Sequence, residues 1–236
     1  AASDVYKRQV ELMEKIIIIG GRGTAIVIAD QICDARKRFN ASIEVLGLAL
    51  DDLSGGDSIS GYQILCGIKD LYQKYGIYDD VKFLYSLYRP DCMDERTKIL
   101  YDLNIPFEKF TNFIHPSVML AKSAILGVGN VFLANVVVNC NAVIGNFNTV
   151  NSGTLLGHDI KIGDNNYFAG QVCVGSGLEI GDKNFFGLNT SIRNGISIGN
   201  SNIVGMSSNI TKSVTDHKVL YGNPAVIKPQ LNHIMR

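Results

Sequence analysis

The chain of 236 residues lacks an excess of charge of either sign: Lys and Arg together number 22, and Asp and Glu together also number 22. Without a net positive field, the protein has no general attraction to nucleic acid or to an anionic membrane surface. The sequence also lacks an apolar run near the roughly 20 residues that a membrane-spanning helix needs, and it shows no secretory signal. We therefore expect neither nucleic-acid binding nor membrane insertion.

Cysteines are few, and none forms a Cys-x-x-Cys pair. The five are scattered along the chain, at Cys33, Cys66, Cys92, Cys140 and Cys173. An odd, scattered set favours free thiols in a reducing compartment, so we expect a cytoplasmic protein. We interpret Cys140 and Cys173 as small apolar filler, because no histidine lies near them in the repeat pattern of the second half of the chain.

The first twelve residues differ in character from the rest of the chain. Residues 1–9 read AASDVYKRQ, which looks like the translation of a sequencing-library adapter, and Met13 then opens the run MEKIIIIGG. We expect residues 1–12 to be a non-native leader and leave them out of the fold prediction.

A six-residue apolar period runs through the second half of the chain. Its members are Ile114, Leu120, Leu126, Phe132, Val138, Ile144, Val150, Leu156, Ile162, Phe168, Val174, Ile180, Phe186, Ile192, Ile198, Val204 and Ile210. No α-helix has this period. It is the hexapeptide signature of a parallel β-helix, in which each short strand sends one side chain into a central column. We therefore predict that these side chains fill the interior of such a helix.

A second period, of eighteen residues, accompanies the first. It is carried by five glycines (Gly127, Gly145, Gly163, Gly181, Gly199) and five asparagines (Asn130, Asn148, Asn166, Asn184, Asn202). Three hexapeptides thus close one coil, which predicts a triangular cross-section and between five and six coils. We expect the glycines to share one corner, where the backbone takes conformations that crowd other residues. The asparagines should hydrogen-bond from coil to coil beside it.

The segment before the repeat alternates strands and helices, which predicts a small parallel sheet of Rossmann type. Apolar runs and helical periodicity place strands at 15–19, 43–50 and 81–87, and helices at 25–39, 64–75 and 94–103. The expected domains are an α/β Rossmann-like domain at 13–110, an all-β parallel β-helix at 111–212 and a C-terminal tail at 213–236.

A glycine-rich turn, Gly20-Gly21-Arg22-Gly23-Thr24, follows the first predicted strand. Such a turn either packs a helix closely against a strand or offers helix N-terminal amides to an anionic group such as phosphate. Asp51 and Asp52 end the second predicted strand, where such folds bind ribose, although a solvated loop has the same composition. Because Ala25 and Ile26 stand where the dinucleotide motif needs another glycine, we do not predict NAD binding.

One stretch of the repeat carries side chains capable of chemistry. His158 stands two residues after the interior position Leu156, so it should point outward near a corner, and Asp159 is adjacent. Asn151 lies seven residues earlier. Histidine changes charge close to neutral pH, and a neighbouring carboxylate supports its basicity. His158 and Asp159 are therefore a candidate general base and its partner, unless His158 is an incidental surface residue.

The other histidines fit other roles. His115 opens the repeat and is expected to be structural, while His217 and His233 fall in the tail. Some hexapeptide proteins hold zinc through three histidines, but this repeat offers only His158 as a convincing ligand. We therefore predict no metal site.

Six motifs along the chain occur together: KIIIIGGRG (15–23), LALDD (48–52), FIHPS (113–117), GHDIKIGD (157–164), NGISIG (194–199) and YGNPA (221–225). With them, the chain from Met13 to about Lys228 resembles the sugar acyltransferase family of sialic acid O-acetyltransferases and bacillosamine N-acetyltransferases. The resemblance implies a homotrimer of left-handed β-helices, with acetyl-CoA bound as co-substrate in a groove between neighbouring coils. It also implies that the N-terminal domain presents a nucleotide-linked amino sugar, in cell-surface polysaccharide biosynthesis.

The same resemblance implies roles for single residues. His158 matches the catalytic base, and Asp159 matches the acid beside it. Positions that match substrate-binding residues are Arg22, Gly23, Thr24, Asp51, Asp52 and Asn151, and positions that match residues near CoA are Tyr167 and Ser176. Thr24 and Tyr167 stand where related enzymes often carry histidines, which leaves the acceptor's identity open. Ser176 replaces a glycine whose backbone N–H faces the thioester.

We therefore expect acetyl transfer from acetyl-CoA to an amine or hydroxyl of a nucleotide-linked sugar. His158 would act as general base, a backbone N–H such as that of Ser176 would meet the oxyanion, and no covalent intermediate would form. Two alternatives stay open. The glycine turn echoes the phosphate loop of sugar nucleotidyltransferases, although only about a hundred residues precede the repeat. The chain could also be an inactive trimeric scaffold, against which the intact Asn151, His158 and Asp159 argue.

Overall fold

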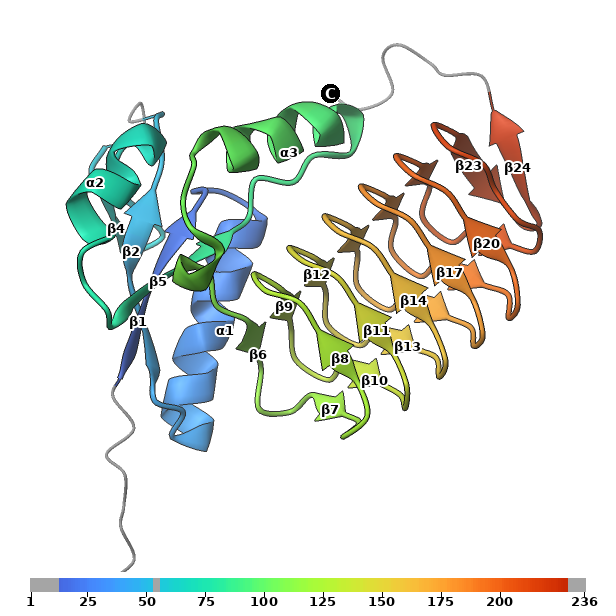
Figure 1. Ribbon diagram of the computed structural model, residues 1–236, viewed down its shortest axis with the longest axis horizontal. Coiled ribbons are helices and arrows are strands. Elements are labelled where there is room, and N and C mark those ends of the chain that lie inside the picture. Colours follow the sequence, from blue (N-terminus) through green and yellow to red (C-terminus); the bar gives the residue numbers. More distant parts are fainter. Residues whose placement is uncertain (1–12, 53–55, 229–236) are drawn as a thin grey trace, which may run out of the picture.

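The protein consists of an α/β domain at one end and a long parallel β-helix at the other (Figure 1). The structure is a computed structural model that describes residues 13–52 and 56–228. The expected leader at 1–12 and His233 lie outside the described residues. Within the described ranges, no helix is both long enough and apolar enough to cross a membrane.

The N-terminal sheet is organised around β1 (Glu14–Ile19), whose residues Ile16 to Ile19 are fully buried. A continuous apolar run of this kind is typical of a parallel strand that is covered on both faces. The strand order is β3-β4-β2-β1-β5, and all neighbours are parallel except the β3–β4 hairpin. The other strands are β2 (Ile43–Ala49), β3 (Ser58–Ile59), β4 (Tyr62–Cys66) and β5 (Val81–Tyr85).

Helices cover the two faces of this sheet. On one face α1 (Thr24–Phe39) packs against Ile16 and Ile18, and on the other α2 (Leu71–Tyr75) and α3 (Met93–Asp102) pack against Ile17 and Ile19. Short 3₁₀ turns complete the connections: η1 (Ile68–Asp70), η2 (Pro90–Cys92) and η3 (Phe107–Lys109). The predicted helix at 64–75 is wrong in its first part, because that segment ends β4, which pairs with β2 before the chain turns.

The repeat forms a left-handed parallel β-helix with three flat faces, each named after one of its strands. The β12 face holds β6 (Phe113–Ile114), β9 (Val131–Phe132), β12 (Thr149–Val150), β15 (Tyr167–Phe168), β18 (Phe185–Phe186), β21 (Ile203–Val204), β23 (Val219–Gly222) and β24 (Ala225–Lys228). The β13 face holds β7 (Met119–Leu120), β10 (Val137–Val138), β13 (Leu155–Leu156), β16 (Cys173–Val174), β19 (Ser191–Ile192) and β22 (Asn209–Ile210). The β14 face holds β8 (Ile125–Leu126), β11 (Val143–Ile144), β14 (Lys161–Ile162), β17 (Glu179–Ile180) and β20 (Ser197–Ile198).

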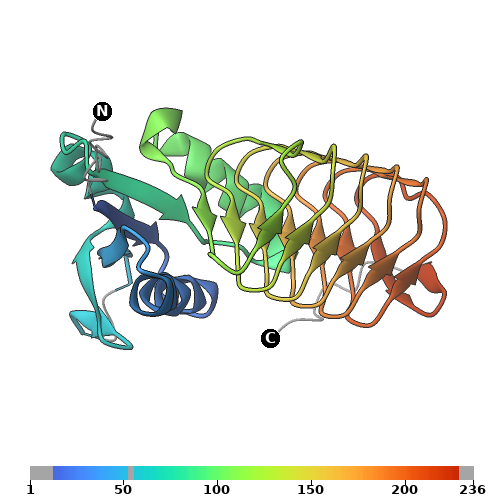
Figure 2. The same cartoon turned by 90° about the horizontal axis from the view of Figure 1, so that it is seen from below.

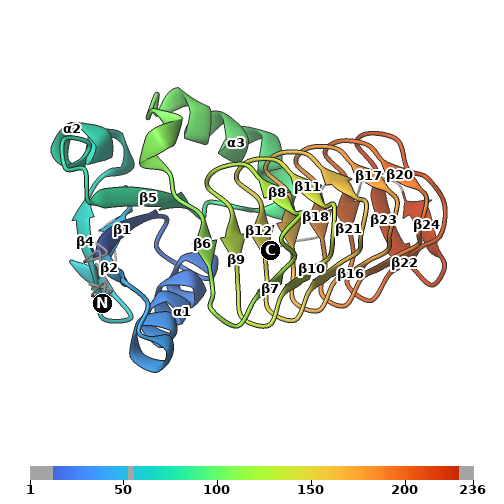
Figure 3. The ribbon, with the colours of Figure 1, turned by 60° about the horizontal axis from the view of Figure 1, so that its bottom comes forward.

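Three corners join these faces, and the coils stack in line (Figure 3). The β12/β13 corner comprises residues 151–154 and their equivalents eighteen residues away in the other coils. The β13/β14 corner comprises residues 157–160 and equivalents. The β14/β15 corner comprises residues 163–166 and equivalents, and it leads back to the β12 face, to which β15 belongs.

The predicted interior is confirmed. From Phe132 to Ile210, every member of the six-residue period is buried in one continuous core. Ile114, Leu120 and Leu126 pack against that core but are only partly buried, because they belong to the first coil, at the end of the column. The tail expected at 213–236 includes the β23–β24 hairpin, whose first strand pairs with β21.

The asparagine ladder is also confirmed. Each of the five asparagines is fully buried at the β14/β15 corner. The Oδ1 of each of the first four accepts hydrogen bonds from the backbone N–H and the Nδ2 of the asparagine in the next coil. The Oδ1 of the last, Asn202, accepts the backbone N–H of Lys218. The periodic glycines share this corner for a steric reason and not because of a positive φ. A Cβ on Gly163 would lie 2.1 Å from the Asp182 Oδ1 of the next coil. That oxygen accepts the backbone N–H of Asp164.

Each corner turns through one residue in the left-handed conformation. Every sixth residue from Gly129 to Ser207 has a positive φ, and many of these residues are glycine, asparagine or aspartate, which tolerate that region best. Asp159, with φ of 55°, is one of them. The turn therefore decides where its side chain points.

The α/β domain packs onto the first coils through specific contacts. Gln31 on α1 accepts the backbone N–H of Ala134 (2.7 Å) and donates to Ser152 (3.0 Å). His115 is buried against α1, where its Nε2 lies 3.2 Å from Asp34, which confirms its structural role. Figure 2 shows α1 beside the first coils. The docked domain thus places the start of α1 over the β12 face.

Candidate active site

His158 and Asp159 form a hydrogen-bonded pair at the exposed β13/β14 corner. The His158 Nδ1 atom lies 2.6 Å from Asp159 Oδ2, and the two side chains are 57% and 54% exposed. An ionised carboxylate only accepts hydrogen bonds, so Nδ1 carries the proton and Nε2 is left with a free lone pair. The hydrogen bonds from Asn141 and then His158 hold the pKa of the Asp159 carboxyl below its usual value. The geometry is that of a general base whose orientation is set by an acid.

The coil fixes this pair through its backbone. The Asp159 N–H donates to the carbonyl of Cys140 (3.0 Å), and the His158 N–H donates to Ser176 Oγ (3.3 Å). Cys140, His158 and Ser176 therefore occupy the same corner position in three consecutive coils. Each residue of the pair is tied to a neighbouring coil, so the position of the imidazole follows from the coil register.

Two sequence-based interpretations at or near this corner are wrong. Cys140 and Cys173 are exposed, so neither is buried filler, and Cys140 lies in the coil next to His158 because the repeat distance is eighteen residues. All five cysteines are free thiols. The backbone N–H of Ser176 does not face open space but donates to Asn194 Oδ1 (2.9 Å). The hydroxyl of Ser176 is then the remaining donor of that residue.

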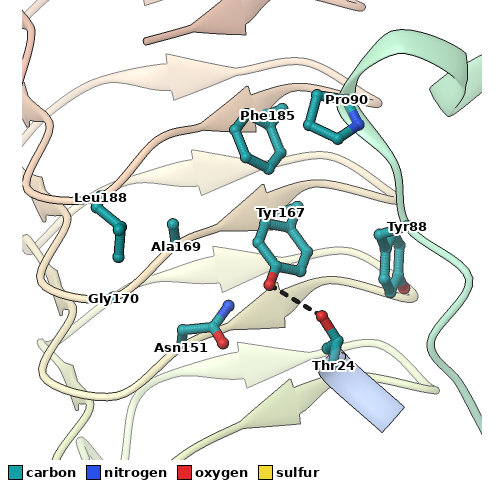
Figure 4. Close-up of a pocket in the computed structure, with 9 residues that line it drawn as sticks. All are labelled: Thr24, Tyr88, Pro90, Asn151, Tyr167, Ala169, Gly170, Phe185 and Leu188. Atoms are coloured by element: carbon teal, nitrogen blue, oxygen red, sulfur yellow. Dashed lines mark hydrogen bonds between the residues drawn. The ribbon is translucent and has the colours of Figure 1, made fainter. Parts of the chain in front are cut away.

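A second group of predicted residues meets at a hollow of about 340 Å³ beside the β12/β13 corner (Figure 4). Thr24, at the start of α1, forms a 3.1 Å hydrogen bond with the hydroxyl of Tyr167 on β15. The full lining is Thr24, Tyr88, Pro90, Asn151, Tyr167, Ala169, Gly170, Phe185 and Leu188. The hollow thus joins the α/β domain to the β-helix.

Aromatic rings form one wall of this hollow. The rings of Tyr167 and Phe185 stack at 5.3 Å with an angle of 9°, and Tyr88 lies 5.7 Å from Tyr167. The Tyr88 hydroxyl donates to the carbonyl of Phe147 (2.6 Å), which fixes that ring. No side chain in the lining carries a full charge at neutral pH. The hollow therefore suits an uncharged ring with polar substituents.

Sequence reasoning missed Tyr88, Pro90, Phe185 and Leu188. Phe185 could have been found, because it lies eighteen residues after Tyr167 and must stack on it in the next coil. Tyr88 and Pro90 come from the segment between β5 and α3, and only the docking of the two domains brings them to the hollow.

The remaining predicted residues lie at the carboxyl ends of the N-terminal strands. Arg22 and Asp52 are exposed, with their charged groups 3.8 Å apart. Gly23 precedes α1 with φ of 59° and open space around it. Asp51 is engaged locally, because its Oδ1 accepts the N–H of Ile68 (2.8 Å). A polar ligand here would contact Arg22, Gly23 and Thr24 more readily than Asp51.

The two groups do not meet within one chain. Asn151 and His158 stand at opposite ends of β13, at different corners of the same coil, and the hollow is not lined by His158. Across residues 13–52 and 56–228, no three His, Cys, Asp or Glu side chains gather closely enough to hold a metal ion.

Comparison with known proteins identifies the fold. No protein-family model matches the chain, and no curated protein matches it in sequence. Solved structures do match. Perosamine N-acetyltransferase (PerB) from Caulobacter crescentus, in complex with CoA and GDP-perosamine, is 20% identical, with a TM-score of 0.74 over 92% of this chain and 98% of its own. The acetyltransferase domain of PglB from Neisseria gonorrhoeae, in complex with acetyl coenzyme A, is 20% identical, with a TM-score of 0.76 over 91% and 99%.

WeeI from Acinetobacter baumannii is 22% identical, with a TM-score of 0.75 over 91% of this chain and all of its own. The match spans both parts of the molecule in each case. The chain therefore has the two-part fold of these proteins, a Rossmann-like α/β domain followed by a left-handed parallel β-helix.

Proposed function

We propose that the protein transfers an acetyl group from acetyl-CoA to an amine or hydroxyl of a nucleotide-linked sugar. The observation that carries this proposal is the His158–Asp159 pair, in which the carboxylate engages Nδ1 and the imidazole is largely exposed at a coil corner. The shared fold supports it, since a perosamine N-acetyltransferase and the PglB acetyltransferase domain have similar structures with CoA and acetyl coenzyme A, respectively.

The reaction proceeds by direct attack. His158 Nε2 takes a proton from the acceptor amine or hydroxyl as that group attacks the thioester carbon. Asp159 holds the Nδ1–H and stabilises the imidazolium that forms. The tetrahedral intermediate then collapses, and the carbon–sulfur bond breaks. CoA leaves as a thiolate, which takes the proton from the His158 imidazolium. No acyl-enzyme is required.

The oxyanion needs a hydrogen-bond donor, and the hydroxyl of Ser176 fits this role. Its Oγ accepts the N–H of His158, so its own proton is directed elsewhere. The Ser176 backbone N–H, which the sequence favours for this role, is engaged by Asn194. We therefore assign the hydroxyl, and not the amide, to the thioester carbonyl.

The acceptor sugar occupies the aromatic hollow in this proposal. The Tyr167–Phe185 stack offers a flat apolar surface to a sugar ring, so we assign Tyr167 to the acceptor and not to CoA, the contact that the resemblance implies. Thr24 and Asn151 offer polar atoms to the substituents of the ring. The nucleotide phosphates extend toward Gly23 at the N-terminus of α1, where free backbone N–H groups and the exposed Arg22 favour anions.

We further propose a homotrimer, because the hollow and the base lie at different corners of one chain. A neighbouring β-helix brings the β13/β14 corner of one subunit to the β12/β13 corner of the next. Apolar side chains exposed on the β13 and β14 faces of the first three coils support such an interface: Met119, Ile125, Val143 and Leu155. The expected setting is the cytoplasm, on nucleotide sugars destined for cell-surface polysaccharides, and the free thiols agree with a reducing compartment.

The proposed reaction is tested by incubating the protein with acetyl-CoA and a panel of nucleotide-linked amino sugars, neutral and carboxylated. Release of CoA together with a product about 42 Da heavier than one sugar, the mass of an added acetyl group, supports the proposal. CoA release with no acetylated product from any sugar, or no release at all, refutes it.

The shared site is tested by mixing inactive subunits. His158→Ala and Asn151→Ala are unfolded and refolded together in equal amounts. If each site takes His158 from one subunit and Asn151 from the next, each mixed trimer has one intact site, which amounts to about a quarter of all sites after random mixing, and activity returns. If both residues act from the same chain, the mixture stays as inactive as its parts.

A further inference from the structure

The Asp159 carboxylate is held at both of its oxygens. Oδ2 receives the Nδ1–H of His158, and Oδ1 receives the side-chain amide of Asn141 at 2.8 Å. Asp159 is exposed, and a carboxylate bonded at one oxygen only would be free to rotate about its Cβ–Cγ bond. The second bond fixes the plane of the carboxylate, and with it the direction in which the imidazole is held.

Asn141 is itself held by the coil. It stands at the same corner position as Asp159, eighteen residues earlier, with φ of 59°, close to that of Asp159. Its backbone N–H donates to Ser123 Oγ at 2.9 Å, one coil further back. On the other side of Asp159 the equivalent position is Gly177, which has no side chain to compete for the carboxylate. The corner thus carries a chain of contacts from Ser123 through Asn141 to Asp159.

The geometry assigns Asn141 as a positioning residue for the proposed acyl transfer: its amide orients Asp159, which in turn fixes the tautomer and direction of the His158 ring. This inference rests on the proposed function for its kinetic consequence. The orientation of the carboxylate and the tautomer of the ring do not depend on that function, and they are measured separately.

Asn141 also favours the ionised form of Asp159, which the positioning role requires. A neutral N–H donor directed at an anionic oxygen favours the ionised carboxyl, and this bond contributes most to the lowered pKa of Asp159. Asn141 therefore helps to keep Asp159 in the charged form that accepts the imidazole Nδ1–H.

The experiment compares Asn141→Gly with a matched control, Asn135→Gly. Glycine keeps the left-handed turn and removes only the side chain. Asn135 is also an exposed corner residue, with φ of 62° and a backbone N–H that donates to a serine, Ser117 Oγ, at 2.9 Å. The residue at its position in the next coil is Gly153, so it has no carboxylate to orient.

The first readout is the ¹⁵N spectrum of the histidine rings, with the His158 signal assigned by its loss in His158→Ala. The wild-type protein should show His158 as the Nδ1–H tautomer. Asn141→Gly should shift it toward a mixture of tautomers, and Asn135→Gly should leave it unchanged. An unchanged tautomer in Asn141→Gly overturns the inference, whether or not the protein transfers acetyl groups.

The second readout is kinetic. Asn141→Gly should lower kcat by roughly 3- to 10-fold, the worth of one hydrogen bond, with KM for acetyl-CoA unchanged. In an Asp159→Gly background the same substitution should have no further effect, because its target is gone. An equal loss in both backgrounds would make Asn141 a purely structural residue and overturn the inference. Failure of the proposed function looks different, since wild type would then acetylate no sugar while the tautomer measurement still decides the role of Asn141.

Discussion

The buried asparagine ladder makes a quantitative prediction about stability. Asn166 is fully buried, and its side chain makes four hydrogen bonds: it donates to Asn148 Oδ1 and Gly181 O, and it accepts from the N and Nδ2 of Asn184. In Asn166→Ala, Asn148 Oδ1 and Asn184 Nδ2 keep other partners. The Gly181 carbonyl and the Asn184 backbone N–H lose theirs. With a buried N–H and a partly buried carbonyl left unpaired, the free energy of unfolding should fall by about 2–6 kcal/mol.

The last rung of the ladder is the matched control. Asn202 is equally buried, but its loss deprives only the Lys218 N–H of its partner, because Asn184 Oδ1 keeps the backbone N–H of residue 202. Asn202→Ala should therefore cost about 1–3 kcal/mol, roughly half as much. Guanidinium unfolding of both variants at one protein concentration, followed by circular dichroism, measures the difference. Equal costs for the two variants would refute the reasoning.

Two further predictions concern the core and the pH dependence. Ile162→Asp should prevent the coil from folding, because an unpaired carboxylate in the column costs several kcal/mol, and a native-like circular dichroism spectrum would contradict this. Because the pKa of Asp159 is lowered in the folded protein, its contribution to stability is present above the ordinary value of about 3.9 and is lost as the pH falls through the lowered value. The stability difference between wild type and Asn141→Gly should thus be present near pH 6 and shrink toward pH 3, and a difference that grows on acidification would be inconsistent with it.

The architecture of the β-helix could be predicted because one residue in six must fill a narrow column. The requirement produces an apolar residue at every sixth position up to Ile210, a pattern that is typical of this fold. The ladder was predictable for the same reason, since eighteen residues return the chain to the same place. The left-handed corner residues were missed, although Asn141 and Asp159 belong to a visible six-residue series. The series is hard to recognise in the sequence because some of its members are not typical turn residues. Phe147, for example, adopts a positive φ.

The candidate site was predictable where it depends on the coil and, through the family resemblance, at Thr24, which lines the hollow. His158 and Asp159 follow from their place after Leu156, and the structure pairs them as expected. Tyr88 reaches the hollow through the docking of one domain on the other, which no local pattern reveals. The β4 strand was mistaken for helix because apolar residues in a short segment fit both periods, and pairing with β2 decided between them.

The most direct test of the proposed chemistry is the kcat of His158→Ala, measured with the acceptor that the sugar panel identifies and with chemistry shown to be rate-limiting. The side chain points outward and is 57% exposed, so its loss leaves no core cavity, and thermal stability and CoA affinity should stay close to wild type. With the general base removed, kcat should fall by roughly 10²- to 10⁴-fold. A variant that keeps more than about a tenth of the wild-type kcat would show that His158 is not the base.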